Sequence, residues 1–389
     1  MRLGFHYHIP AVEINGRIHT LALQGLFLDA LAERVEKLVL FLHTPNENER
    51  ALMDYALSSN NIECYSLGPH NSTPARLLRG RKLARKVAGI CREKQIDLLL
   101  FRAPTPLLPL IVPQIAPRTH YAYLVVGDAG EHLHTLQQPR WRKFLIQQYI
   151  RWNENRQYTM APKAAVVLTN SPALQHKYPA SQLVRTTTLR KTDFYHRTDA
   201  CSTPPYRILY SGRIEFNKGL LTLARAVVVL QQSGINAILD VVGWAAPGDT
   251  TLEHTAQVFE AAGMADKWTF HGKKQAGPQL FAHYREADVF VLPSQSPEGF
   301  PRTIWEAMAH CLPVVCTPVG AIPHLLRDEE TALFFEAGNA AAAAEKIGRL
   351  IDAPQLRRQL TQNAWALAQH STLEIQTDKI IQYLHDGIA

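Results

Sequence analysis

Two glutamates, Glu298 and Glu306, stand eight positions apart in a stretch that can bring both to one site. Two continuous apolar runs, residues 289–292 and 312–315, lie on either side of them and are typical of buried parallel strands. The first glutamate falls in the polar loop after one strand, and the second falls in a helix of about three turns that follows. Carboxylates accept hydrogen bonds from hydroxyl groups, so this pair is suited to binding a sugar.

The start of that helix is suited to binding phosphate. Pro301 has the fixed φ that favours a first helical turn, which leaves the N–H groups of Arg302 and Thr303 free. A helix N-terminus attracts phosphate, and a nucleotide sugar carries both a phosphate and a sugar. The spacing alone is weak support, because such pairs occur by chance and the helix dipole favours an early glutamate in any case.

The sequence around the two glutamates is a more specific signal than their spacing. It consists of Glu-Gly-Phe at 298–300, Glu-Ala-Met-Ala at 306–309 and Pro-Val-Val at 313–315. This string resembles the signature of the family 4 glycosyltransferases of GT-B architecture. The resemblance implies that the first glutamate contacts the donor sugar and the second contacts the ribose. It also implies a donor-binding role for Gly299, Phe300, Pro301, Arg302 and Thr303. The match departs at Cys311, normally Gly, and at His324, often Glu, but neither position carries chemistry in the family.

A basic motif follows the strand predicted over residues 206–211. Arg213 stands at its end, and Lys218 with Gly219 opens the next helix. Open α/β sheets bind ligands at the carboxyl ends of their strands, where two cations can hold a diphosphate without a metal ion. A solvated Arg and Lys at such a junction is the ordinary alternative, but the Gly-Arg-x4-Lys-Gly string resembles the family's diphosphate clamp. No Asp-x-Asp occurs in the chain, so we expect no metal ion and no other cofactor.

The remaining candidates come from the resemblance. Trp244 and the run His271-Gly272-Lys273 fit positions that line the nucleobase, where the family often uses backbone groups. Asp128 is the closest match to the acceptor-side polar residue, which makes it a catalytic candidate, and His132 is the second choice. Gly16 in the first half could let backbone N–H groups approach the phosphates, although an ordinary left-handed turn explains it nearly as well.

Length and charge limit the classes of protein to which the chain can belong. The 389 residues suggest two domains, and 46% hydrophobic with 19% charged residues is an ordinary globular composition. Residues 1–200 hold 26 Lys+Arg and 15 Asp+Glu, a balance of +11, whereas the remainder carries −4 of the net +7. No nucleic-acid-binding motif accompanies this basic half, so we expect an anionic lipid or acceptor as its partner and no nucleic acid.

A basic helix predicted within residues 74–94 is the strongest indication of a membrane partner. Leu83, Val87 and Ile90 share one stripe that can pack on a sheet, so most of the basic side chains point outward. No acidic residue occurs between Glu63 and Glu93. A solvated surface helix is the alternative to peripheral docking.

Other features favour a cytoplasmic protein that binds peripherally at the inner face of the membrane. The five cysteines form no Cys-x-x-Cys pair, which argues against structural zinc and a disulfide framework. Histidines interrupt the first residues, so they do not resemble a signal peptide, and no apolar run is long enough to span a membrane.

The order of predicted elements indicates an α/β protein with two doubly wound, Rossmann-like domains. Strands are predicted over residues 3–8, 38–42, 62–67, 97–101, 121–126 and 164–168, and over 206–211, 237–243, 268–271, 289–292 and 313–317. Helices are predicted over 18–35, 219–232, 251–262, 279–286, 339–351 and 354–369. We expect an acceptor-binding domain over 1–190, a linker, and a nucleotide-sugar-binding domain over 206–370. A final segment, 371–389, would hold a helix that crosses back to the first domain. The resemblance implies the GT-B plan, in which two parallel sheets face a central cleft.

These observations together predict a retaining, metal-independent glycosyltransferase. It would move a hexose, with glucose preferred, from a UDP-sugar to a saccharide or lipid-linked saccharide in polysaccharide or glycoconjugate synthesis. Retention and the sugar class are implied by the resemblance alone. A GT-B nucleotide-sugar epimerase and an inactive UDP-sugar-binding module remain the alternatives.

Overall fold

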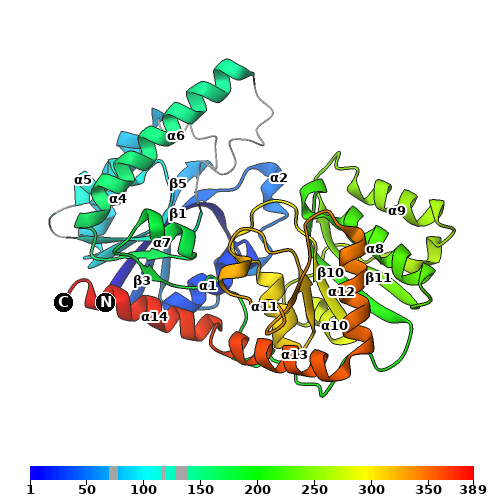
Figure 1. The fold of residues 1–389 in the computed structure, drawn as a ribbon. Coiled ribbons are helices and arrows are strands. Elements are labelled where there is room, and N and C mark those ends of the chain that lie inside the picture. The colour runs from blue at the N-terminus through cyan, green and yellow to red at the C-terminus, as the bar shows by residue number, and fades with distance from the viewer. Residues whose placement is uncertain (70–77, 116, 118, 128–138) are drawn as a thin grey trace. The chain divides into compact units, whose positions relative to one another are not determined.

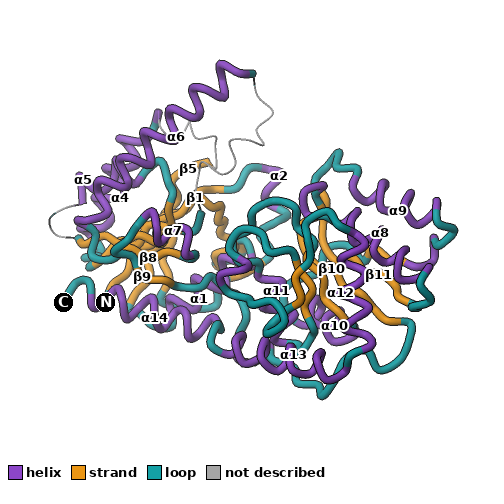
Figure 2. The backbone as a smooth tube through the Cα atoms, viewed as in Figure 1, coloured by secondary structure: helices purple, strands orange, loops and turns teal. Residues whose placement is uncertain are grey.

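The computed structural model of the chain describes residues 1–69, 78–115, 117, 119–127 and 139–389. The chain forms two compact units, each with a largely parallel sheet between layers of helices (Figures 1 and 2). Unit 1 comprises Met1–Thr186 and Glu374–Ala389, and unit 2 comprises Thr187–Leu373. Residues 187–205, which the sequence assigned mostly to a linker, therefore belong to unit 2.

The sheet of unit 1 has strand order β4-β2-β1-β6-β7-β8-β9, and β3 pairs with both β1 and β5. Its strands are β1 (Arg2–Ile14), β2 (Arg17–Thr20), β3 (Lys37–Thr44), β4 (Tyr55–Ala56), β5 (Ile62–Pro69), β6 (Leu98–Ala103), β7 (His120–Val125), β8 (Val167–Thr169) and β9 (Gln182–Leu183). The central strands pair in parallel, whereas β2 pairs antiparallel with both β1 and β4.

Alternate residues of these strands face two separate cores, because successive side chains of a strand point to opposite faces. The helices of the unit are α1 (Ala22–Ala32), α2 (Glu47–Arg50), α4 (Gly80–Glu93), α5 (Leu108–Ile115), α6 (Arg140–Met160), α7 (Pro172–Lys177) and α14 (Leu373–Asp386). Helices α1 and α14 pack in one core, while α4, α5 and α7 pack in the other.

The sheet of unit 2 is parallel throughout, with strand order β12-β11-β10-β13-β14-β15. Its strands are β10 (Tyr206–Ile214), β11 (Ala237–Ala245), β12 (Trp268–Phe270), β13 (Val289–Leu292), β14 (Val314–Cys316) and β15 (Leu333–Phe334). Helices α8 (Leu220–Gln232), α9 (Thr251–Ala261) and α12 (Ala340–Asp352) cover one face. Helices α10 (Pro278–Glu286), α11 (Arg302–Ala309) and α13 (Pro354–Gln369) cover the other.

The structure corrects two predictions in unit 1. The segment predicted as a strand over 3–8 and a loop to residue 16 is a longer strand that continues to Ile14 and turns back into β2. The helix predicted over 18–35 begins only at Ala22, because β2 occupies the residues before it. In the part of the chain that the structure describes, no helix is long and apolar enough to cross a membrane.

Candidate functional site

The centre of the candidate site is an ion pair between Lys218 and Glu298 in unit 2. The lysine ends a short 3-10 turn, η4 (Phe216–Lys218), and its Nζ lies 2.5 Å from Oε1 of the glutamate. The Ser294 hydroxyl donates to the same oxygen at 2.5 Å. Both charged side chains are mostly buried, with 16% and 14% of their surface exposed. Such a pair is strengthened by its low-dielectric surroundings, and it joins residues 80 positions apart.

Two glycines position the backbone around this ion pair. Gly219 has φ of 76°, and a Cβ added to it would lie 1.9 Å from the carbonyl oxygen of Pro293. Gly320 has φ of 59°, and its Cβ would lie 2.1 Å from the carbonyl oxygen of Glu298. That oxygen accepts a hydrogen bond from the N–H of Ala321 at 2.7 Å. The close backbone approach therefore requires glycine at both positions.

The Lys218 turn is also joined directly to the loop after β13. The Gln295 N–H donates to the Asn217 carbonyl oxygen at 2.8 Å, and the Gln295 side chain donates to the Thr222 hydroxyl at 3.0 Å. The Thr317 hydroxyl, after the next strand, donates to the Ser294 carbonyl oxygen at 2.6 Å. Three loops at the carboxyl ends of β10, β13 and β14 are thus linked by hydrogen bonds, which is where open α/β sheets bind ligands.

Arg213, the second predicted cation, lies near the end of β10 and is half-exposed. Its guanidinium lies 3.0 Å from the Glu215 carboxylate, and its carbonyl oxygen accepts from the Tyr210 hydroxyl at 2.6 Å. Lys218 and Arg213 therefore form ion pairs with different acids, Glu298 and Glu215, although both cations lie near the connection from β10 to α8.

Glu306 is buried in α11, and its surroundings were not evident from sequence. The Tyr284 hydroxyl on α10 donates to Oε2 of Glu306 at 2.8 Å. Burial raises the pKa of the Glu306 carboxyl, while the hydrogen bond from Tyr284 and the nearby Arg302 act in the opposite direction. The helix that carries it has 8 residues, so it is shorter than the three turns predicted.

The residues at the start of α11 lie where the motif places them. Pro301 is the residue before the first helical turn, and Arg302 and Thr303 are its first two helical residues. The Phe300 ring packs against that of Trp305 at 4.4 Å between centroids. Gly299 belongs to the preceding loop. The N-terminus of α11 and Glu298 thus form one continuous segment.

The residues predicted to line the nucleobase differ in the exposure and hydrogen bonding of their side chains. Trp244 is exposed near the end of β11. The Nε2 of His271 lies 2.7 Å from Oδ1 of Asp240, whose other oxygen lies 2.9 Å from Arg207. The backbone of Gly272 accepts from the Gly243 N–H at 3.1 Å. The His271 side chain is therefore engaged within the sheet, and Lys273 follows it in the exposed loop.

The Asp240–Arg207–His271 cluster is a second arrangement that sequence reasoning missed. His283 on α10 also lies close, with its ring 4.5 Å from that of His271. Burial lowers the pKa of His283, with a further contribution from the neighbouring His271. The four residues are separated by up to 76 positions in sequence, so no local pattern could have joined them.

The three candidates predicted in unit 1 are Asp128, His132 and Gly16. Asp128 and His132 lie outside the described residues. Gly16 has φ of 72° and, with Asn15 at 51°, forms the two-residue turn of the β1–β2 hairpin. The prediction that this glycine leads into a helix is wrong, because Asn-Gly is a favoured hairpin turn and a strand follows it.

A small hollow lies at the carboxyl ends of β6 and β7 in unit 1. Ala103, Val125 and Gly127 form part of its wall, and Gln157 of α6 contributes from the other side. The Glu154 carboxylate and Lys177 ammonium, 3.2 Å apart, also line it. Gly127, the residue that precedes Asp128 in sequence, thus lines the hollow. No three His, Cys, Asp or Glu side chains converge as metal ligands within the described part of the chain.

Comparison with known proteins agrees with this geometry. Residues 193–366 match the family model described as glycosyl transferases group 1. A D-inositol 3-phosphate glycosyltransferase of Arthrobacter sp. (strain FB24) is 31% identical over 187 residues, which are 46% of this chain and 44% of that protein. The protein of the same name from Streptomyces griseus subsp. griseus is 33% identical over 167 residues, 41% of this chain and 35% of that one. The matches thus span less than half the length of these relatives.

Solved structures match over nearly the whole chain. Anabaena Alr3699/HepE in complex with UDP has a TM-score of 0.73 at 18% identity and covers 99% of this chain and 100% of its own. The sucrose-phosphate synthase of Thermosynechococcus elongatus has a TM-score of 0.71 at 19% identity, with 98% of each chain covered. Residues 193–366, which hold Lys218, Glu298 and Glu306, therefore match the model of the group 1 glycosyl transferases, and the chain has the GT-B fold.

Proposed function

We propose that the protein is a retaining glycosyltransferase that moves a hexose, with glucose the preferred candidate, from a UDP-sugar to a saccharide or lipid-linked saccharide. The Lys218–Glu298 ion pair carries the proposal, because it places a cation for a diphosphate directly beside a carboxylate for sugar hydroxyls. The fold of the chain resembles that of Anabaena Alr3699/HepE, which has been crystallised with UDP-glucose. The expected setting is polysaccharide or glycoconjugate synthesis.

The chemistry requires stabilisation of a leaving diphosphate. The bond between the anomeric carbon and the phosphate oxygen breaks, and the acceptor oxygen forms its bond to that carbon on the same face. The acceptor proton passes to the leaving phosphate oxygen. Lys218, Arg213 and the N-terminus of α11 would stabilise the charge that develops on the phosphate. These cations take the place of a metal ion, and the absence of Asp-x-Asp from the sequence supports that proposal.

The donor has to compete with the existing ion pair. Lys218 Nζ already neutralises Glu298, so a diphosphate that approaches the lysine would release a carboxylate oxygen for the sugar. Ser294 would keep its hydrogen bond to the same carboxylate and hold it in place. Recognition of the phosphate and of the sugar would therefore be coupled through one pair of side chains.

The rest of the donor would bind along the same edge of the sheet. Glu306 would accept from a ribose hydroxyl while Tyr284 fixes the orientation of its carboxylate. Exposed Trp244 and the backbone of Gly272 would line the nucleobase, and Lys273 would lie beside them. His271 would support this region through Asp240 rather than contact the base with its ring.

The acceptor would bind in unit 1, with Asp128 as the acceptor-side polar residue. Helix α4 supports docking of this unit on the inner face of an anionic membrane. Its Val87 and Ile90 are buried, and Arg81, Lys82 and Arg85 are exposed, as the sequence predicts. A lipid-linked acceptor would then be within reach of a protein that binds the membrane only from its surface.

Calorimetry with UDP and with UDP-glucose tests the proposal. Glu298→Gln should bind UDP at least as tightly as the wild type and abolish transfer, because it removes the sugar contact and releases Lys218 from its ion pair. Glu306→Ala should weaken UDP itself, since its ribose contact is present with or without the sugar. Loss of UDP affinity in Glu298→Gln with none in Glu306→Ala would reverse the assigned roles.

The same purified protein distinguishes the two alternatives. A nucleotide-sugar epimerase would convert or hydrolyse UDP-glucose without any acceptor. An inactive binding module would bind UDP, with a rise in melting temperature, and would turn over no donor in the presence of any acceptor fraction. Transfer of labelled glucose to a saccharide or lipid extract would support the proposed reaction over both.

A further inference from the structure

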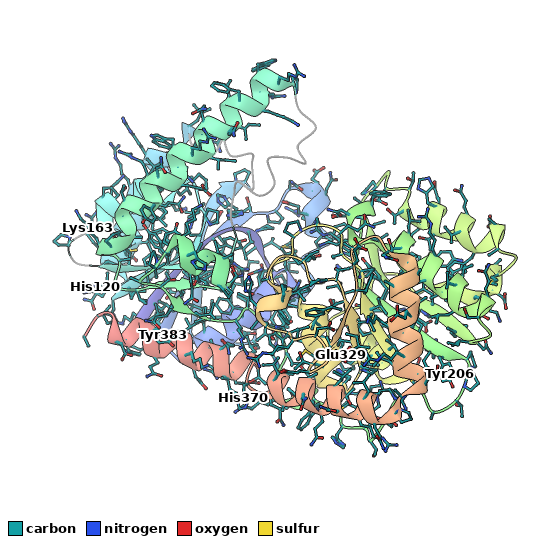
Figure 3. The ribbon with its side chains drawn as sticks, viewed as in Figure 1. His120, Lys163, Tyr206, Glu329, His370 and Tyr383 are labelled. Carbon is teal, nitrogen blue, oxygen red and sulfur yellow. The ribbon has the colours of Figure 1, made fainter. Side chains whose placement is uncertain are left out.

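Helix α6 is unusual among the helices of unit 1 because most of its length is not buried. Of its 21 residues, Asn153 and Gln157 are the buried ones. Large apolar side chains are exposed instead: Trp141 by 65%, Phe144 by 58%, Leu145 by 57% and Trp152 by 47%. The N-terminal part of the helix extends away from the sheet of unit 1, and its side chains project outward (Figures 1 and 3).

The exposed apolar residues lie on one face of the helix. At about 100° per residue, Trp141, Leu145 and Trp152 fall within about 40° of one another around the axis, and Phe144 lies about 60° to one side. Gln148, also exposed, lies between them. We call this face the α6 stripe, defined by Trp141, Phe144, Leu145, Gln148 and Trp152. The buried Asn153 and Gln157 point to the opposite face, so the stripe faces away from the core.

The stripe is bordered by positive charge. The helix carries five basic residues and one acid, Glu154, which is 3.2 Å from Lys177. The basic residues are Arg140, Arg142, Lys143, Arg151 and Arg156. Arg151 and Arg156 lie about 20° beyond the two edges of the stripe, one on each side. The guanidinium of Arg156 lies over the Trp152 ring, 5.4 Å from its centroid.

These features favour an anionic lipid surface as the occupant. Tryptophan beside arginine is suited to the boundary between headgroups and acyl chains, where one end of a side chain is apolar and the other is wet. Each basic residue near an anionic leaflet strengthens binding about fivefold. A second copy of the chain would instead bring two positively charged helices together, which disfavours self-association through this face.

We propose that the α6 stripe inserts into the surface of an anionic membrane, with the helix lying along that surface. This goes beyond the electrostatic docking of α4, whose exposed side chains in the range Gly80–Glu93 are charged. Helix α5 packs against both α4 and α6, so the two helices belong to the same layer of unit 1. The α4 charges would attract the protein to the membrane, and the α6 stripe would anchor it there.

Vesicle binding by the full-length protein at two salt concentrations tests the proposal. With vesicles of phosphatidylglycerol and phosphatidylcholine, binding should fall between 0.05 and about 0.5 M salt but keep a salt-resistant part, because insertion of apolar groups is not screened. The pair Trp141→Ser with Trp152→Ser should lower that salt-resistant binding at least tenfold. Brominated lipid should quench wild-type tryptophan fluorescence and leave this variant less quenched.

A gain-of-binding variant protects the test against a folding defect. Gln148→Leu adds an apolar group to the stripe and should tighten salt-resistant binding at least twofold. Leu52→Ser, which removes an exposed apolar side chain of unit 1 outside α6, is the control and should bind like wild type. UDP affinity should be the same in all these proteins, so the result does not depend on whether the proposed transfer occurs.

Two outcomes would overturn the proposal. One is salt-resistant binding that is unchanged in the tryptophan pair and in Gln148→Leu, or absent from the wild type. The other is a stable dimer of the wild type in solution that the tryptophan variants convert to a monomer, because the stripe would then cover a second copy of the chain.

Discussion

Substitution of Gly320 by alanine tests whether this glycine positions the Glu298 carboxylate. The residue has φ of 59°, and the new Cβ would lie 2.1 Å from the carbonyl oxygen and 2.3 Å from the nitrogen of Glu298. Both atoms are backbone, so the clash cannot be relieved by rotating a side chain. The loop that holds Glu298 has to move, and with it the 2.5 Å contact to Lys218.

The expected cost has two parts. A left-handed conformation costs alanine about 1–2 kcal/mol. The shift of the loop removes the hydrogen bond from Ala321 to the Glu298 carbonyl oxygen, which is worth about 1 kcal/mol. We therefore expect Gly320→Ala to lower the free energy of unfolding by about 2–3 kcal/mol. A displacement of about 1 Å at a catalytic group can cost about a hundredfold in rate, so transfer should fall by at least tenfold.

Gly338→Ala is the matched control. This glycine also has a left-handed φ, 81°, but its nearest neighbour would be the Gln295 side chain at 4.0 Å. Gly338→Ala should lose only the conformational part of the free energy of unfolding, about 1–2 kcal/mol, and keep its activity. Urea unfolding measures the stabilities, and transfer from UDP-glucose measures the activities. Equal destabilisation of the two variants with equal activity would refute the assigned role of Gly320.

Four further outcomes are expected. Glu306→Gln should be more stable than wild type at pH 8 and similar to it near pH 4. Burial raises the pKa of Glu306, so its ionised form destabilises the folded protein once the pH exceeds the pKa of the unfolded state. A melting-temperature difference that does not change with pH would contradict this. Burial lowers the pKa of His310 from 6.5 to about 4. The neutral ring therefore contributes up to about 3 kcal/mol to the free energy of unfolding above pH 6.5, and this contribution should be lost as the pH falls towards 4. His310→Phe should make the free energy of unfolding less dependent on pH over this range. EDTA should leave turnover intact, whereas Arg213→Ala should lower kcat/KM by at least tenfold; strict dependence on added Mn²⁺ or Mg²⁺ would contradict the metal-independent mechanism. Charge reversal of Arg79, Lys82 and Lys86 at the start of α4 should lower the fraction of protein that sediments with anionic vesicles at low salt. An unchanged bound fraction would mean that α4 is an ordinary solvated surface helix.

Much of unit 2 could be predicted from sequence because its elements are local. The continuous apolar run predicted strand β13 at Val289–Leu292, and the helical pattern predicted α13 at Pro354–Gln369, both with the observed bounds. The motif also indicated that Glu298 and Lys218 serve one site, and the structure places their charges 2.5 Å apart. Polar residues that follow parallel strands meet at one edge of the sheet, so strand order alone brings them near one another.

The hairpin and α6 were missed because their local patterns were ambiguous. Asn15-Gly16 is a hairpin turn, but the partner strand β2 has only four residues and little apolar periodicity. Helix α6 has no single apolar stripe in its sequence, because Ile146 and Ile150 lie on the opposite side of the axis from the α6 stripe. Only the exposure of the stripe residues in the folded unit separates them from a buried set.

The sequence by itself determined most elements of unit 2, the site motif and the family resemblance, because these depend on residues close together in the chain. The tertiary structure decided the partners of the charged groups: Tyr284 for Glu306, Asp240 for His271, and Glu215 for Arg213. Two of these three pairs join different helices or strands of unit 2. Their geometry depends on how α10, α11 and the strands pack, and the energy of each pair depends on its burial, which no local pattern specifies.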